Sequence, residues 1–254
     1  MKRAVNHLSF VLIATLLSGP AFGGRVVVFT DEWFTSNTGF TNDSPNSTTF
    51  TDNLVNLFGT GSYLVYSNVV PGLTESSFTN RLTTDGVTVT QTVASGQILT
   101  GFKAVLLAGP ITGGVAPNAA ALIAYVNGGG NVFLEAGTGG FAGGAAGESA
   151  AWAPFLGTFG ITLATTYNTG NPCQNYAITS ANPLFSGVTQ LYECGGQQTT
   201  ASGSASVIAT NATVPVSVLA VVSSVPEPGT LSLLMAGVFL LTGRVAVRKF
   251  RPTR

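Results

Sequence analysis

The chain alternates between short apolar runs, which predict strands, and segments whose apolar residues recur at helical spacing. Three runs are almost entirely apolar and end at a polar residue or glycine, which is typical of strands buried on both faces of a parallel sheet. They are RVVVFT at 25–30, FKAVLLAGP at 102–110 and NVFLEAG at 131–137. The run SYLVYSNV at 62–69 predicts a further strand, and the alternating GVTVTQTV at 86–93 predicts a strand at a sheet edge.

Helices are predicted between these runs. Phe50, Leu54, Leu57 and Phe58 recur at helical spacing and are followed by Gly59, a common helix stop. Three other segments predict helices. The first is TESSFTNRL at 74–82, the second begins at Pro117 and ends at the glycines 128–130, and the third contains Trp152, Phe155, Leu156 and Phe159.

The order of these elements predicts an α/β fold. Strands that alternate with helices form a mostly parallel sheet with helices on both faces. The polar segment 31–47 is predicted to be a loop, and the chain from Ile161 onward is predicted to form short strands and loops.

Charge is sparse and unevenly distributed along the 254 residues. Lys, Arg, Asp and Glu make up 8% of the chain, and the formal net charge is zero. Seven of the ten basic residues lie near the two ends, whereas residues 24–224 contain three basic and nine acidic residues, a net charge of −6. Such a body lacks the basic surface that nucleic-acid phosphates require, so nucleic-acid binding is not expected.

The first 23 residues predict a secretory signal peptide. Two basic residues precede an apolar run from Leu8 to Leu17, and the helix-breaking Gly19-Pro20 follows it. Cleavage after Gly23 would make Gly24 the first residue of the mature chain. An uncleaved anchor helix is the alternative, although the apolar run is shorter than the roughly 20 residues that a membrane span needs.

Residues 223–254 predict a membrane-anchored tail. A mostly apolar segment, 230–247, is the predicted transmembrane helix, and a basic tail, 248–254, follows it. With the N-terminal part exported, basic residues stop transfer and stay on the cytoplasmic side. Those expected to do so are Arg244, Arg248, Lys249 and Arg251. Residues 24–222 then form the exported α/β domain.

The tail resembles a known sorting signal. Val225-Pro226-Glu227-Pro228, a short apolar span and an arginine-rich end together resemble the PEP-CTERM signal of Gram-negative bacteria that make exopolysaccharide. The resemblance implies recognition by an exosortase, a membrane-embedded cysteine transpeptidase that cuts near the motif. It also implies a transient membrane anchor followed by a cell-surface or extracellular location. A plain C-terminal anchor is the alternative.

The body resembles a known domain class through three fragments: FKAVLLAGP, ALIAYVNGGGNVFLEAG and ITSANPLFSGV. They are similar to flavodoxin-like domains of the class I glutamine-amidotransferase-like superfamily. The last fragment resembles the segment HPLF-x-G-V, with Asn182 where histidine is usual. The catalysis of that family needs a cysteine in a strand-to-helix elbow, with histidine and glutamate downstream.

Those catalytic residues are missing here. The single histidine, His7, lies in the predicted signal peptide, and neither Cys173 nor Cys194 lies in a strand-to-helix elbow. The resemblance therefore implies a scaffold without the chemistry of its family. In an oxidising compartment the two cysteines predict a disulfide, and a metal site is the weaker alternative because two thiols without histidine make a poor zinc site.

Three carboxylates follow predicted strands. Asp31 and Glu32 come after the first strand, and Glu135 ends the strand at 131–137, so all three would lie at the carboxyl edge of the sheet. One interpretation is a cleft for acid–base chemistry or calcium. The other is that Asp31 and Glu32 are loop carboxylates, solvated or capping the following helix. No cofactor is indicated.

Two classes of function remain. The first is a non-catalytic surface or matrix protein, exported, sorted and associated with exopolysaccharide. The second is a carboxylate-dependent hydrolase or lyase that acts on extracellular polysaccharide. A permanent inner-membrane protein whose domain lies in the periplasm is a third possibility. The absence of histidine from the predicted mature chain favours the first class.

Overall fold

The computed structural model of the chain describes residues 23–69, 71–94, 96–110, 118–168, 172–211 and 218–224. The predicted signal peptide up to residue 22, the sorting motif at 225–228, the transmembrane segment and the basic tail lie outside the described residues. Among the helices that are described, none combines the length and the apolar character needed to cross a membrane.

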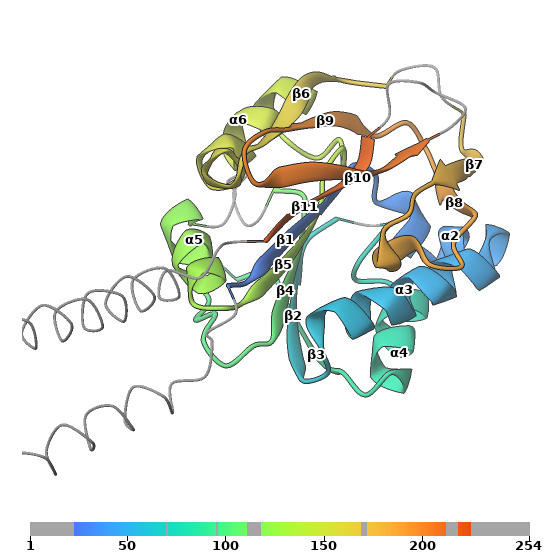
Figure 1. Ribbon diagram of the computed structural model, residues 1–254, viewed down its shortest axis with the longest axis horizontal. Helices are drawn as coiled ribbons and strands as arrows, with labels where there is room; N and C mark the ends of the chain where they lie inside the picture. Colours follow the sequence, from blue (N-terminus) through green and yellow to red (C-terminus); the bar gives the residue numbers. More distant parts are fainter. Residues whose placement is uncertain are drawn as a thin grey trace, which may run out of the picture. The chain divides into compact units, whose positions relative to one another are not determined.

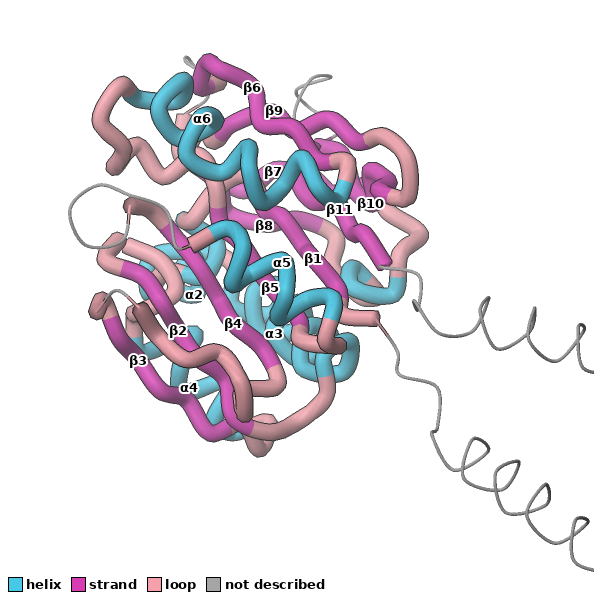
Figure 2. The backbone as a smooth tube through the Cα atoms, turned by 90° about the vertical axis from the view of Figure 1, so that its left-hand side faces the viewer, coloured by secondary structure: helices cyan, strands magenta, loops and turns pink. Residues whose placement is uncertain are grey.

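Five parallel strands form one half of the main sheet, in the order β3-β2-β4-β5-β1. Their bounds are β1 Arg25–Phe29, β2 Ser62–Ser67, β3 Thr88–Thr92, β4 Ala104–Ala108 and β5 Asn131–Glu135. Figure 2 shows them side by side. The predicted α/β fold with a mostly parallel sheet is confirmed for this half, and β3 lies at the sheet edge as expected.

Four antiparallel strands continue the sheet from β1, in the order β11-β10-β7-β8. They are β7 Gln174–Thr179, β8 Gln190–Glu193, β10 Ala205–Asn211 and β11 Val218–Ser224. A separate pair, β6 Ile161–Tyr167 and β9 Gln197–Ala201, is also antiparallel. The last described strand, β11, thus lies inside the sheet between β1 and β10 (Figure 1).

Helices cover both faces of the sheet (Figure 1). One face carries the helices α3 and α4 and the short 3-10 helix η3, and the other carries α5, α6 and the strand β6. Their bounds are α3 Ser44–Phe58, α4 Ser76–Thr84, η3 Pro183–Phe185, α5 Ala119–Asn127 and α6 Gly144–Leu156. The described residues also contain three shorter elements: η1 Trp33–Thr35, α2 Asn37–Asn42 and η2 Gly157–Phe159.

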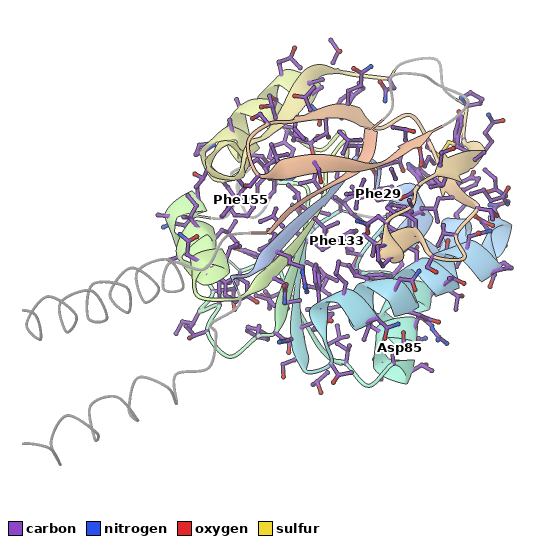
Figure 3. All side chains as sticks on the ribbon, in the orientation of Figure 1. Phe29, Asp85, Phe133 and Phe155 are labelled. Carbon is purple, nitrogen blue, oxygen red and sulfur yellow. A yellow bond between two sulfur atoms is a disulfide. The ribbon has the colours of Figure 1, made fainter. Side chains whose placement is uncertain are left out.

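The packing of β1 explains why its sequence is apolar after Arg25. Val27 and Phe29 pack into the core under α3, and Val26 and Val28 pack into the core under α6, because successive side chains of a strand point to opposite faces. The core under α3 is rich in aromatic rings and includes Phe29 and Phe133, which are labelled in Figure 3. Phe155, also labelled there, belongs to the core under α6.

The predicted loop at 31–47 was wrong over most of its length, since it holds η1, α2 and the start of α3. The side chain of Ser36 accepts a hydrogen bond from the Gly39 amide, at 2.9 Å, and so caps α2. Pro45 lies in the first turn of α3, where proline is compatible with a helix. The predicted stop at Gly59 is confirmed, with a φ of +84°.

Candidate functional site

The carboxyl ends of β1 and β5 bring the predicted carboxylates together. These two strands are neighbours, but α3 follows β1 on one face and α6 follows β5 on the other. Such a reversal opens a crevice at the carboxyl ends of parallel strands, where ligands of open α/β sheets bind. The chain places Asp31 and Glu32 after β1 and Glu135 at the end of β5, so the three predicted carboxylates meet there.

Asp31 holds two loops of the body together. Its Oδ1 accepts a hydrogen bond from the Trp33 amide at 2.7 Å, and its Oδ2 accepts one from the Cys194 amide at 2.9 Å. The side chain is 1% exposed. Burial raises the pKa of Asp31 to about 7, although both backbone hydrogen bonds favour its charged form. The interpretation of Asp31 and Glu32 as solvated carboxylates was wrong. Glu32 occupies the N-cap position of η1 without a capping side-chain hydrogen bond, and Asp31 instead binds the first amide of η1.

Glu135 is completely buried at the end of β5. Thr35 donates a hydrogen bond to its Oε1 at 2.7 Å, and its Oε2 has no hydrogen-bond partner among the described residues. A methyl group added at Gly72 would lie 3.2 Å from that Oε2 and 3.3 Å from the Glu32 Cβ. The loop that follows β2 therefore closes directly over both glutamates. Burial raises the pKa of Glu135 well above its usual range, and the charges of Glu32 and Asp31 raise it further.

Glu32 lies between the other acids and is 6% exposed. Burial raises its pKa to about 9, and the negative charges of Asp31 and Glu148 add to that shift.

A fourth acid, Glu148 on α6, completes the cluster and was missed from the sequence. Its Oε1 accepts from the Gly137 amide at 3.1 Å and from the Thr138 hydroxyl at 3.3 Å, and its Oε2 accepts from the Tyr167 hydroxyl at 3.2 Å. Burial raises the pKa of Glu148 to about 7 against these hydrogen bonds. The available signal was a single charge inside a stretch of alanine, glycine and aromatic residues, which predicts a buried and partnered side chain.

Segments around Gly137 and Gln197 cover the carboxyl ends of β1 and β5. The Gln197 amide donates to the Thr30 carbonyl at 2.8 Å, and the Gln197 side chain donates to the carbonyls of Ala145 and Ala164. Glycine is required at two positions where the backbone passes close to the Thr30 carbonyl. A methyl group at Gly137 would lie 2.5 Å from the Thr30 oxygen, and one at Gly196 would lie 2.3 Å from it. The four acids of this carboxyl cluster, Asp31, Glu32, Glu135 and Glu148, are therefore packed under the chain itself.

The carboxyl cluster does not have the geometry of a metal centre. Across the described residues, no three or more His, Cys, Asp or Glu side chains are arranged to hold a metal ion. A shallow surface pocket of about 390 Å³ lies elsewhere, between α2, α3 and α4, and its walls include Ser44, Asn80 and Arg81 but none of the four acids.

The predicted disulfide is confirmed between Cys173 and Cys194. It joins the residue before β7 to the residue after β8, next to the cross-strand pair Gln174 and Glu193. Because the Cys194 amide also binds Asp31, the disulfide fixes one wall of the carboxyl cluster.

Replacing both cysteines by serine is expected to lower the free energy of unfolding by about 3 kcal/mol, the loop-entropy value for a closed loop of roughly 20 residues. Urea unfolding of the Cys173→Ser/Cys194→Ser variant measures the loss. The wild-type chain under reducing conditions is the matched control and should lose a similar amount. An unchanged midpoint in both samples would show that β7, β8 and Asp31 hold this region without the bond.

Comparison with protein-family models, with curated proteins and with solved structures finds no match for this chain. The geometry of the described residues and the sequence itself therefore carry the functional argument. The sorting motif and the predicted basic stop lie outside the described residues.

Proposed function

We propose that the chain is an exported cell-surface or extracellular-matrix protein of a Gram-negative bacterium, sorted by an exosortase-type transpeptidase and associated with exopolysaccharide. The body, in this proposal, works by binding or display and without catalysis. The observation that carries the sorting step is the order of the last 30 residues: Val225-Pro226-Glu227-Pro228, an apolar run and a basic end. A signal-peptide pattern at the opposite end agrees with it.

The carboxyl cluster supports a body without catalysis. A general acid or nucleophile has to reach its substrate, whereas Asp31, Glu135 and Glu148 are buried and bind groups of their own chain. The likeness to amidotransferase-like domains remains part of the proposal and rests on three sequence fragments. The observed order β3-β2-β4-β5-β1 differs from the 2-1-3-4-5 order of flavodoxin, because β1 lies at the far end of the parallel strands.

The strand pairing supports tethering at one edge of the body. Arg25 pairs with Ser224, so the first residue of β1 and the last residue of β11 are neighbours. The chain enters and leaves the sheet at the amino end of β1, and the carboxyl cluster lies at the other end of that strand. Both points at which a terminal segment joins the body therefore lie at the edge of the sheet opposite the carboxyl cluster.

Intact mass spectrometry of the protein from fractionated native cells tests the proposal. We expect loss of residues 1–23 and of the tail beyond the 226–228 region, in a species found outside the inner membrane. A mass 2 Da lower than that of the reduced sample would report the disulfide. A full-length tail in the inner-membrane fraction would overturn the sorting step.

The alternative function is a carboxylate-dependent hydrolase or lyase acting on extracellular polysaccharide. One observation favours it: several carboxyl groups with raised pKa values gather near the carboxyl ends of β1 and β5, and such groups are found at catalytic sites. Release of reducing ends or of unsaturated sugars from purified exopolysaccharide tests it. Activity that a Glu32→Gln substitution abolishes, while the thermal midpoint stays within a few degrees, would establish this alternative over the first proposal.

A further inference from the structure

Gly24 is docked on the end of a helix. It lies just before β1, it is buried, and its amide donates a hydrogen bond of 2.9 Å to the carbonyl of Val126. Val126 belongs to the last turn of α5, which ends at Asn127. The nitrogen of Gly24 therefore faces the carbonyl end of α5, where the helix dipole is negative.

No other residue fits at position 24. A methyl group there would lie 1.8 Å from the Gly130 oxygen and 2.7 Å from the Val126 oxygen. Two carbonyl oxygens thus lie against the Cα of Gly24, and the Val126 oxygen also accepts the hydrogen bond of its nitrogen. A small site rich in carbonyl oxygens is suited to a cationic N–H donor.

The end of α5 lacks a cation of its own. Its last turn contains no basic side chain, and within the described part of the chain its last carbonyls accept hydrogen bonds from backbone amides, such as those of Gly128 and Gly129. The end of α3, on the opposite face of the sheet, does bind a cation: the Arg25 guanidinium donates a hydrogen bond of 2.5 Å to the Leu57 carbonyl. Consecutive residues at the start of β1 therefore bind the ends of one helix on each face.

We propose that removal of the signal segment between Gly23 and Gly24 creates a charged N-terminus that binds the carbonyl end of α5 and locks β1 in place. In that step water hydrolyses the peptide bond, Gly23 leaves with the new carboxyl group, and Gly24 keeps its nitrogen as an amine that takes up a proton. The proposal rests on the export step of the proposed function. It adds that signal-peptide removal provides the carbonyl end of α5 with a positive charge, the α-ammonium group of Gly24.

The charge of the new α-amino group on Gly24 sets the pH dependence of its hydrogen bond to the Val126 carbonyl. The charged and titratable residues on the segments around it are Arg25 on β1, Tyr125 on α5 and Lys103, whose carbonyl accepts hydrogen bonds from Asn131 of β5. Burial raises the pKa of Tyr125, which stays neutral throughout the relevant range. An α-amino group ordinarily has a pKa of about 7.7 to 8.0. Because the helix end favours the cation, the stabilisation is present below about pH 8 and is lost as the pH rises through the higher folded value.

Two full-length chains test the proposal, both released from a cleavable fusion and held in the same detergent. One begins at Gly24 and the other at Gly23, so that the second has the same hydrogen bond at Gly24 but carries its amine one residue away. Thermal unfolding is measured from pH 6.5 to pH 10. We expect the chain that begins at Gly24 to melt about 1 to 4 °C higher at pH 6.5, with the difference disappearing by pH 10.

Selective acetylation of the α-amine at pH 6.5 provides a second readout. It should lower the thermal midpoint of the chain that begins at Gly24 and leave the chain that begins at Gly23 unchanged. Identical pH profiles for the two chains, or no response to acetylation, would overturn the docking. A native N-terminus other than Gly24 would overturn the proposed cut even if the docking contact were measured. Failure of the C-terminal sorting step would affect neither result.

Discussion

Truncation of the chain after residue 217 is expected to abolish cooperative folding of the body. The truncation removes β11, which lies between β1 and β10 in the middle of the sheet. Five residue pairs join β1 to β11, from Arg25 with Ser224 to Phe29 with Ala220. Each buried backbone group left without a partner costs about 1–3 kcal/mol, and a domain is stable by only about 5–15 kcal/mol. Circular dichroism should show no cooperative thermal transition.

A chain that ends at Ser224 is the matched control. It lacks the predicted motif and tail but keeps every pair that β11 makes with β1 and β10. We expect a single thermal transition within a few degrees of that of the full chain. If the chain ending at residue 217 unfolded with the same midpoint as this control, β11 would be dispensable and the observed sheet order would be contradicted.

The parallel half of the sheet was predictable because its strands carry their own signal. Runs such as VVVF and AVLLA are apolar at every position, which is typical of strands buried on both faces. The antiparallel half was not predictable in its arrangement. The segments SVIAT and VLAVVS predict short strands. No local pattern indicates that VLAVVS pairs with residues 25–29, which lie almost 200 positions earlier in the chain.

The carboxyl cluster was predictable in part for a similar reason. Asp31, Glu32 and Glu135 were identified because they follow buried strands, and strand ends meet at one edge of a parallel sheet. Their burial was not predictable, because it depends on the loops containing Gly72 and Gly196, which fold over them from distant parts of the chain. Glu148 was missed because it does not follow a predicted strand; it lies on α6, in the helix that Trp152 and Phe155 indicate.

Stability of the body is expected to fall steeply between pH 5 and pH 9. Burial gives Asp31, Glu32 and Glu148 higher pKa values in the folded chain, about 7, 9 and 7, than the 3.8 to 4.5 of free side chains. Folding therefore takes up protons, so the stabilisation is complete below about pH 4 and is lost as the pH rises through the folded pKa values. For Glu148 alone, about 1.4 kcal/mol per pKa unit corresponds to roughly 3 kcal/mol. Urea unfolding at pH 5, 7 and 9 measures the slope.

The Glu148→Gln substitution separates this titration from the packing of the site. Glutamine can still accept the hydrogen bonds of Gly137 and Thr138, but it cannot ionise. We expect the variant to gain about 1–3 kcal/mol over the wild type at pH 9, to gain nothing at pH 5 and to show a shallower pH slope. Equal slopes in the wild type and in Glu148→Gln would mean that Glu148 stays ionised in the folded chain, and that its three hydrogen bonds outweigh its burial.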